Sequence, residues 1–244
     1  MLFGIMVISK DIRRVLDGTA PRVVLTTSDF GIPTEYQPAL VVALNRMVAS
    51  GKLERIGKGK YYKPKNSVFG SVPPDTSELI KDFLQRNNSV VGYVTGVNAF
   101  SKLGLTTQIS STITIGTNKY RSPMMRGNIK IVFLLQPNKI CKQDVELYII
   151  LDALRLIREI PGTTPNNCVD IIMNIIKSLP QKSQSRLSKL AIAYTPFVRA
   201  LLGAIYENLL LPCDMLKKSL NGTTNYFLPI SEEVLPTKRN WRII

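Results

Sequence analysis

The chain has 244 residues, 45% of them hydrophobic, and its 32 Lys and Arg against 17 Asp and Glu give a net charge of +15. Such a chain can bury one large or two smaller cores, and its positive charge makes nucleic acid or an acidic partner the leading class of ligand. The sequence contains no histidine. This excludes Ser-His-Asp and Cys-His catalysis, His-ligated zinc and histidine general-base chemistry.

The cysteines and the first residues indicate the compartment. Cys141, Cys168 and Cys213 are odd in number and far apart, which matches neither a disulfide framework nor a zinc pair. The opening "MLFGIMVI" has no preceding basic segment and no small-residue cleavage site, so we expect no signal peptide. No uncharged apolar run approaches the roughly 18 residues of a membrane span. A cytoplasmic protein that makes no use of a membrane is therefore expected.

The N-terminal third predicts three helical segments. Residues 8–17 place apolar side chains on one helical stripe, and Gly18 follows as a natural C′ residue. After a short β-branched run, Thr27 or Ser28 caps a brief helix that is interrupted at Gly31. A longer helix is expected from Glu35 to Ser50, with Thr34 as its N-cap.

The longer helix has two different faces. Leu40, Leu44 and Met47 recur at the spacing of a core-facing stripe. Asn45 and Arg46 lie on the opposite face, and these side chain types make bidentate contacts to adenine and guanine edges. Tyr36 and Gln37 stand in the first turn, where recognition helices often touch bases or phosphates.

The stretch "KLERIGKGKYYKP" predicts a strand, a tight turn and a second strand, because Gly57 and Gly59 permit the dihedral angles of a turn. Helix, short helix, longer helix and hairpin is the order of a winged helix-turn-helix. The lysines of the hairpin would contact phosphate, which gives affinity without base readout. The predicted DNA-binding residues are Thr34, Tyr36, Gln37, Asn45, Arg46, Lys52, Arg55, Lys58 and Lys60. A domain used only for protein contacts is the alternative for this region.

Two stretches were candidates for enzyme chemistry. "GKGKYY" lacks the spacing of a phosphate-binding P-loop. "GSVPPDTSE", residues 70–78, loosely resembles a nucleotidyltransferase metal motif, but Asp75 and Glu78 fit the acidic first turn of a helix better. No acid, base and metal set converges, so we expect no enzyme, no catalytic residue, no cofactor and no metal.

The remaining chain predicts an α+β unit over residues 67–140 and a mainly helical region over 141–244, packed together; the winged domain occupies residues 1–66. "STITIGT" and "IKIVFLL" are strong strand patterns, and two later helices begin with Thr-Pro, a cap followed by proline at the first helical position. A basic, exposed segment joins the strands. The polar loop after a helix is best interpreted as a structural turn. The alternative is a partner surface that combines this loop with the basic segment; its residues are Lys119, Arg121, Arg126, Thr106, Thr107 and Gln108.

Four segments carry a family resemblance over almost the full length. They are "DFGIP…ALNRMVASGKLERIGKGKYYKP", "GYVTGVNAFSKLGLTTQ", "AYTPFVRALLGAIYENL" and "LKKSLNGTTNYFLPISEEVLPTKRNWRI". The chain resembles the AbiEi-like antitoxins of abortive-infection systems and a related group of bacterial proteins of undescribed function. The resemblance implies an N-terminal winged helix that binds operator DNA at its own promoter. It also implies a C-terminal domain needed to neutralise a nucleotidyltransferase-like toxin in a type IV toxin-antitoxin system, where direct binding to the toxin is not the rule. By this resemblance the partner surface is also the candidate toxin-antagonism surface.

The leading hypothesis is a DNA-binding antitoxin and transcriptional autorepressor, active in phage defence, with double-stranded DNA as its direct partner. The alternative is a non-enzymatic adaptor that binds protein or RNA and uses the winged helix for docking. The sequence defines neither the operator nor the oligomeric state.

Overall fold

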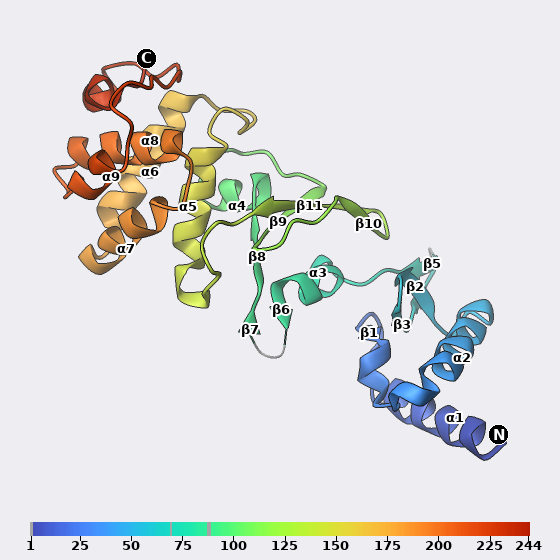
Figure 1. Ribbon diagram of the computed structural model, residues 1–244. Coiled ribbons are helices and arrows are strands. Elements are labelled where there is room, and N and C mark those ends of the chain that lie inside the picture. The colour runs from blue at the N-terminus through green and yellow to red at the C-terminus, as the bar shows by residue number, and fades with distance from the viewer. Residues whose placement is uncertain (1, 69, 87–88) are drawn as a thin grey trace. The chain divides into compact units, whose positions relative to one another are not determined.

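The computed structural model describes residues 2–68, 70–86 and 89–244 (Figure 1). The chain forms two compact units. The N-terminal unit comprises residues 1–82 together with 124–129, and the C-terminal unit comprises residues 83–123 and 130–244. The boundary between the two units thus lies near residue 82, whereas boundaries at residues 66 and 140 were predicted. Helices and strands are mixed throughout, which confirms the α+β class.

The N-terminal unit begins with helices and closes with short strands. Its elements are α1 (Leu2–Asp17), β1 (Val24–Thr26), η1 (Thr27–Phe30), η2 (Thr34–Tyr36), α2 (Gln37–Ala49), β2 (Glu54–Gly57), β3 (Lys60–Tyr62), β4 (Lys65–Ser67), β5 (Gly70–Val72), most of α3 (Thr76–Leu84) and β10 (Met124–Arg126). An antiparallel sheet in the order β1-β3-β2 places the predicted hairpin beside the strand that follows α1.

The predicted hairpin turn is confirmed at Gly59, whereas Gly57 lies in β2 and has no positive φ. Gly51 closes α2 with φ +71°, and Gly59 takes φ +66° at the tip of the β2–β3 hairpin. These left-handed dihedrals favour glycine, since a Cβ atom makes them strained. The β2–β3 register also shifts between Arg55 and Gly57, where a bulge accommodates the extra residue.

Two cap predictions are wrong by a small displacement. The cap of η1 is Thr26, one residue before the predicted Thr27, and Thr26 forms a capping box with Asp29. Thr34 does not cap the long helix, because residues 34–36 form the separate turn η2 and α2 starts at Gln37. The start differs from the prediction by the one or two residues over which helix boundaries commonly vary.

The core of the N-terminal unit is small. Leu40 and Leu44 of α2 are fully buried, as the periodicity predicted, and Ile12 and Leu16 of α1 pack in the same cluster. The other buried members of this cluster are Leu25, Phe30, Ile32, Leu53 and Tyr61. The cluster packs α1, α2 and the sheet together and so fixes the orientation of the outer face of α2 within this unit.

The C-terminal unit has a sheet followed by a set of helices. Its elements are β6 (Gln85–Arg86), β7 (Ser89–Val90), β8 (Gly92–Thr95), α4 (Val97–Lys102), β9 (Thr112–Thr117), β11 (Ile129–Leu135), η3 (Lys142–Asp144), α5 (Val145–Arg155), α6 (Pro165–Ser178), α7 (Gln181–Ala191), α8 (Pro196–Asn208), α9 (Asp214–Lys218) and η4 (Pro236–Trp241). Strand β9 pairs parallel with β11 and antiparallel with β8.

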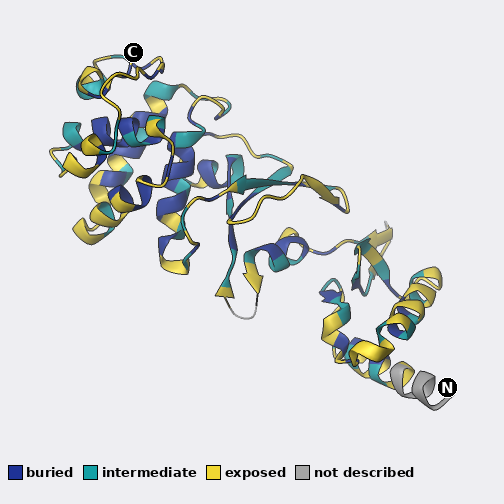
Figure 2. Ribbon diagram, viewed as in Figure 1, coloured by how far each residue is buried: buried dark blue, intermediate teal, exposed yellow. Residues whose placement is uncertain are grey.

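The helices α5, α6 and α8 supply half of the buried residues in the C-terminal core (Figure 2). Both Thr-Pro signals mark helix starts, since Pro165 and Pro196 occupy the first helical positions of α6 and α8. Thr164 caps α6 by accepting a hydrogen bond from the Asn167 backbone at 3.3 Å. The Thr-Pro pattern is therefore confirmed as a start signal.

Trp241 anchors the last segment to the core. Its side chain is 2% exposed, and its indole N–H donates to the Glu207 carboxylate. The ring lies where a side chain at Gly203 of α8 would stand, since a Cβ built there would approach the ring within 2.1 Å. A buried ring in this position holds the segment in place and is not an exposed stacking platform for nucleic acid.

A polar cluster lies inside the C-terminal core. Asp152 of α5 is fully buried and accepts hydrogen bonds from Tyr93, Thr95 and Tyr194 at 2.7, 2.9 and 3.0 Å. Gln136 donates to both tyrosine hydroxyls. Burial raises the pKa of Asp152 to about 6. Because each member has partners, this cluster fastens α5 to the sheet.

Candidate nucleic-acid interface

The outer face of α2 is exposed as the helical wheel predicted. Asn45 and Arg46 are exposed, opposite the buried Leu40 and Leu44. Val42, 51% exposed, lies on the same face and supplies an apolar surface between the polar side chains. A helix with an amide, a guanidinium and an apolar group on its outer face carries the side chains that read base edges in a major groove.

The predicted DNA-binding residues at the start of α2 differ in whether their side chains are free to contact a ligand. Thr34 and Tyr36 are exposed in η2, and Tyr36 is 43% exposed. Gln37 instead donates its side-chain amide to the Ile32 carbonyl at 2.8 Å, which holds the preceding loop against the helix. Gln37 is therefore a positioning residue in this structure, whereas Thr34 and Tyr36 present their side chains to solvent.

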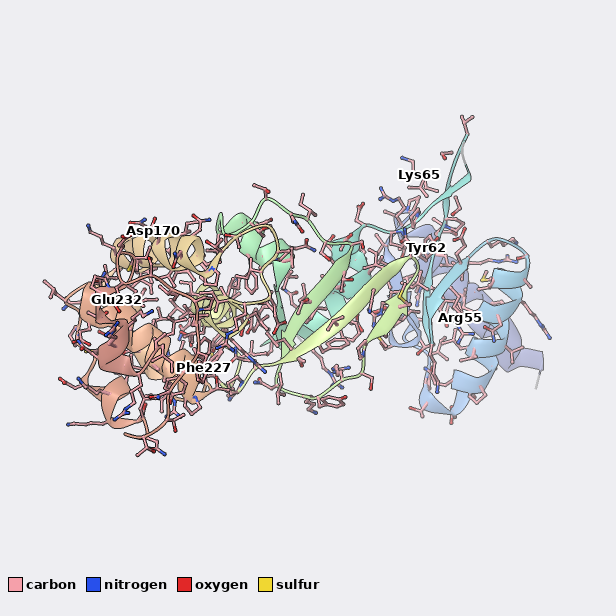
Figure 3. The ribbon with its side chains drawn as sticks, turned by 90° about the horizontal axis from the view of Figure 1, so that it is seen from above. Arg55, Tyr62, Lys65, Asp170, Phe227 and Glu232 are labelled. Atoms are coloured by element: carbon pink, nitrogen blue, oxygen red, sulfur yellow. The ribbon has the colours of Figure 1, made fainter. Side chains whose placement is uncertain are left out.

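The hairpin carries two exposed cations in the same unit as this helix. Arg55 lies on β2, next to the strand that carries Tyr62 (Figure 3), and donates from Nε to the Gly57 carbonyl at 3.1 Å. Lys58 is exposed at the turn, and Lys52 is exposed between α2 and β2. Tyr62 donates to Glu54, so the acid of β2 is engaged by the sheet itself.

Lys60 does not extend from the tip of the hairpin as predicted. Its ammonium group lies 3.0 Å from the Asp82 carboxylate of α3, and its side chain is only 18% exposed. Asp82 also accepts two hydrogen bonds from Arg126, one of them at 2.9 Å. Although burial acts to raise it, hydrogen bonds from Arg126 and Lys60 hold the pKa of Asp82 below its ordinary value. Lys60 thus fastens the hairpin to α3.

The acids in and near α3 form ion pairs with some cations of the N-terminal unit and not with others. Asp75 pairs with Arg22, Glu78 with Lys81 at 2.7 Å, and Asp82 with Lys60 and Arg126. In the described part of the chain, no ion pair involves the four cations of the α2 and hairpin surface, which are Arg46, Lys52, Arg55 and Lys58. None of these four shares its charged group with a carboxylate of the described chain, so an external anion can pair with them.

The predicted partner surface is not one surface. Arg126 is 5% exposed and belongs to the N-terminal unit, which corrects the expectation of an exposed basic residue. Thr106 is also buried and donates to the Pro161 carbonyl at 2.6 Å. Both side chains hold the fold and are unavailable to a partner.

The exposed members of that set lie at opposite ends of β9. Thr107 and Gln108 precede the strand, whereas Lys119 and Arg121 follow it. Six residues of extended strand separate the two groups by about 20 Å. Arg121 stacks over Phe83 and Phe133, with its guanidinium carbon 5.3 and 5.8 Å from the ring centroids.

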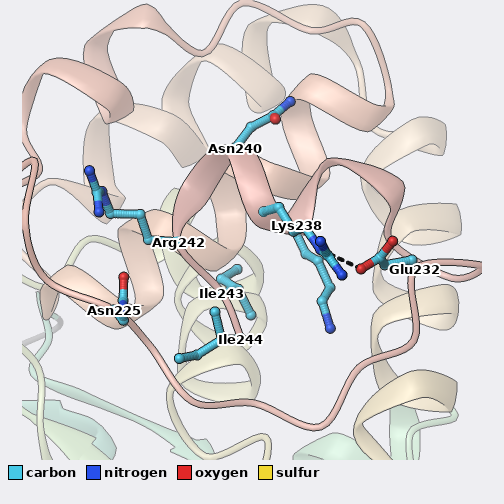
Figure 4. Close-up of a pocket in the computed structure, with 8 residues that line it drawn as sticks. Asn225, Glu232, Lys238, Asn240, Arg242, Ile243 and Ile244 are labelled. Atoms are coloured by element: carbon cyan, nitrogen blue, oxygen red, sulfur yellow. Dashed lines mark hydrogen bonds and ion pairs between the residues drawn. The ribbon is translucent and has the colours of Figure 1, made fainter.

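The C-terminal segment forms a pocket of about 700 Å³ around η4 (Figure 4). Lys238, Arg239 and Arg242 line it. Arg239 pairs with Glu232, and Lys238 donates to the Ile230 carbonyl, so two of these cations already have partners. In this pocket Arg239 is thus in an ion pair, and Lys238 is bonded to a carbonyl as Arg55 is on the hairpin.

Within residues 2–68, 70–86 and 89–244, no group of three or more Cys, Asp or Glu side chains is arranged to hold a metal ion. Over the same ranges, no helix has both the length and the apolar character needed to cross a membrane.

Comparison with known proteins identifies the family. Residues 11–187 match a family of unknown function, DUF6088. The chain belongs to this family. The matched range contains the whole α2 and hairpin surface of this DUF6088 protein. The crystal structure of the RV2827C protein from Mycobacterium tuberculosis is similar, with 12% identity, a TM-score of 0.48, and coverage of 84% of this chain and 78% of that chain. No curated protein matches the chain.

Sequence reasoning missed the Lys60–Asp82–Arg126 cluster and the Asp152 cluster. Asp82 and Arg126 are 44 positions apart, and Tyr93 and Asp152 are 59 apart. No local periodicity reports such pairings. The one available signal was Asp152 itself, an acid within the strongly apolar "LYIILDALRLI".

Proposed function

We propose that the N-terminal unit is a winged helix-turn-helix domain that binds double-stranded DNA through α2 and the β2–β3 hairpin. The observation that supports this most directly is the set of four cations on that surface without an ion pair among the described residues: Arg46, Lys52, Arg55 and Lys58. The element order and the three-stranded sheet agree with this proposal.

The proposed contacts divide by chemistry. Asn45 and Arg46 would read base edges in the major groove, with Thr34 and Tyr36 near the start of the helix. Lys52, Arg55 and Lys58 would contact phosphates, which fixes register and supplies affinity without sequence readout. Lys60 and Gln37 would act indirectly by holding the hairpin and the loop in place.

From the resemblance stated above, the proposed role is that of a non-enzymatic antitoxin and autorepressor in a type IV toxin-antitoxin system. The protein would act in the cytoplasm, occlude its own promoter and counteract a nucleotidyltransferase-like toxin. Among the alternatives, an adaptor that docks protein or RNA through the same surface remains the second candidate, since four unpaired cations also fit an acidic protein.

The test is binding of the duplex upstream of the protein's own gene, measured by fluorescence anisotropy beside a random duplex of equal length. Asn45→Ala or Arg46→Ala is expected to cost about 1–3 kcal/mol on the operator and less on the random duplex. Lys177→Ala, an exposed change on α6, serves as the control. Equal losses on both duplexes would contradict base readout, and no binding to either duplex would contradict the DNA proposal.

A further inference from the structure

The N-terminal unit contains a cavity of about 440 Å³ between α1 and α2. Ile12, Met47 and the exposed Val42 form part of its apolar lining. The volume falls in the range of small-molecule sites, which are concave, mostly apolar and equipped with a few polar groups. Nothing in the proposed DNA contacts requires a hollow at this position.

The charged groups of this cavity have one sign. Arg13 of α1, Arg46 of α2 and Lys52 line it together, and no acid is among its described lining residues. The nearest acid in the sequence of α1, Asp11, pairs with Arg14 at 3.2 Å. Three cations around an apolar hollow are complementary to a ligand with an apolar body and an acidic group.

We propose that this cavity binds a small amphipathic anion, a carboxylate or sulfonate attached to an aromatic or branched apolar body. The apolar body would pack on Ile12, Val42 and Met47. The acidic group would accept hydrogen bonds from the cations at the edge, with Arg13 as the member that belongs to the cavity but not to the proposed DNA contacts.

Binding at this position would regulate the DNA surface. Arg46 and Lys52 line the cavity and also belong to the proposed DNA contacts, so an anion that engages them competes with phosphate and base edges for the same groups. By thermodynamic linkage, bound DNA would lower the affinity of the chain for the anion by the same factor. This regulatory step rests on the proposed function, whereas the binding of the anion does not.

The experiment uses the full chain and the fluorescent probe 1-anilinonaphthalene-8-sulfonate, titrated without DNA. The expected result is saturable binding of one probe per chain. Arg13→Gln is expected to weaken it about tenfold, because one charge-assisted contact is lost. The matched control is Arg14→Gln, the neighbouring exposed arginine outside the cavity, for which a change under about twofold is expected.

A second matched pair tests the hollow itself. Val42→Phe adds bulk at the cavity and is expected to reduce probe binding, whereas Val41→Phe, on the adjacent exposed position that does not line the cavity, is expected to leave it unchanged. Circular dichroism of all four variants checks their folding. Equal effects of Arg13→Gln and Arg14→Gln, or a stoichiometry other than one, would overturn the proposal.

The final arm adds the operator duplex. Saturating probe is expected to raise the Kd for the duplex several-fold in the wild type and much less in Arg13→Gln at the same probe concentration. A chain that binds the duplex but not the probe overturns the anion site and leaves the DNA proposal intact. A chain that binds the probe but no duplex supports the site and contradicts the DNA proposal. Self-association that blocks the probe, detected by sedimentation, overturns the anion site in favour of a contact between copies.

Discussion

The two units hold a carboxylate in different surroundings, half-buried at Asp82 and fully buried at Asp152. In the N-terminal unit Asp82 meets the cations Lys60 and Arg126, whereas in the C-terminal unit Asp152 meets the hydroxyl groups of Tyr93, Thr95 and Tyr194. The pKa of Asp82 is lowered, and that of Asp152 is raised to about 6. Cations offset the cost of burying negative charge, but neutral donors at Asp152 offset it only in part.

This difference separates the roles of charge in the molecule. Around α3, ion pairs use up some of the basic residues and leave those of the α2 and hairpin surface available. In the C-terminal unit, Asp152 has no cation among its hydrogen-bond partners in the described chain, whereas the buried Asp144 pairs with Arg186 at 2.7 Å. Net charge alone therefore does not say which basic residues form ion pairs; the positions of the acids in the folded chain decide that.

The largest expected effect tests how much the C-terminal core depends on its last segment. Trp241→Ala is expected to lower the free energy of unfolding by about 4 kcal/mol, because a fully buried indole and its bond to Glu207 are lost. Urea unfolding followed by circular dichroism measures it. Phe227→Ala, at a residue 70% exposed, is the matched control with an expected change under about 0.5 kcal/mol. Similar losses for both would contradict the anchoring role.

The next effect is a pH dependence that belongs to Asp152. Its pKa rises from an ordinary value of 3.8 to about 6 on folding, so the folded chain holds the proton more tightly. Stability from this group is thus fully present below about pH 4 and is lost as the pH rises to about 6, by up to about 3 kcal/mol. Urea unfolding at several pH values should show this decline in the wild type and not in Asp152→Asn. Parallel curves would refute it.

Asp82 provides the opposite case. Asp82→Ala removes the carboxylate between Lys60 and Arg126 and is expected to lower the free energy of unfolding by about 2 kcal/mol. The loss is smaller than for a fully buried ion pair because the Asp82 side chain is 33% exposed. Asp75→Ala removes the exposed carboxylate that pairs with Arg22 and is expected to lower the free energy of unfolding by about 0.5 kcal/mol. Thermal unfolding compares the two variants. Equal costs would show that the cluster is no stronger than a surface pair.

The smallest effect separates the two lysines of the hairpin. Lys58→Ala is expected to reduce the slope of log K against log salt by about 0.9 for duplex binding, because one phosphate contact is lost. Lys60→Ala should leave that slope nearly unchanged and reduce stability, since its ammonium group pairs with Asp82. Salt titrations of duplex affinity measure both. A lower slope for Lys60→Ala would place that lysine at the DNA.

Local sequence patterns identified much of the fold. The stripe of Leu40 and Leu44, the turn at Gly59 and the helix starts at Pro165 and Pro196 were predicted correctly. Each depends on a backbone preference or a short periodicity that a few neighbouring residues determine. The same reasoning correctly placed Asn45 and Arg46 on an exposed face.

The tertiary structure decided which charged and polar residues are available. Lys60 and Lys58 are two positions apart in one basic stretch, yet one pairs with Asp82 and the other is exposed. Arg126 and Thr106 looked like surface residues in the sequence, but both are buried. The sequence by itself determined local backbone structure and the apolar faces, because these follow from nearby residues. Partners from distant segments decided burial and charge pairing, because only the folded chain brings those residues together.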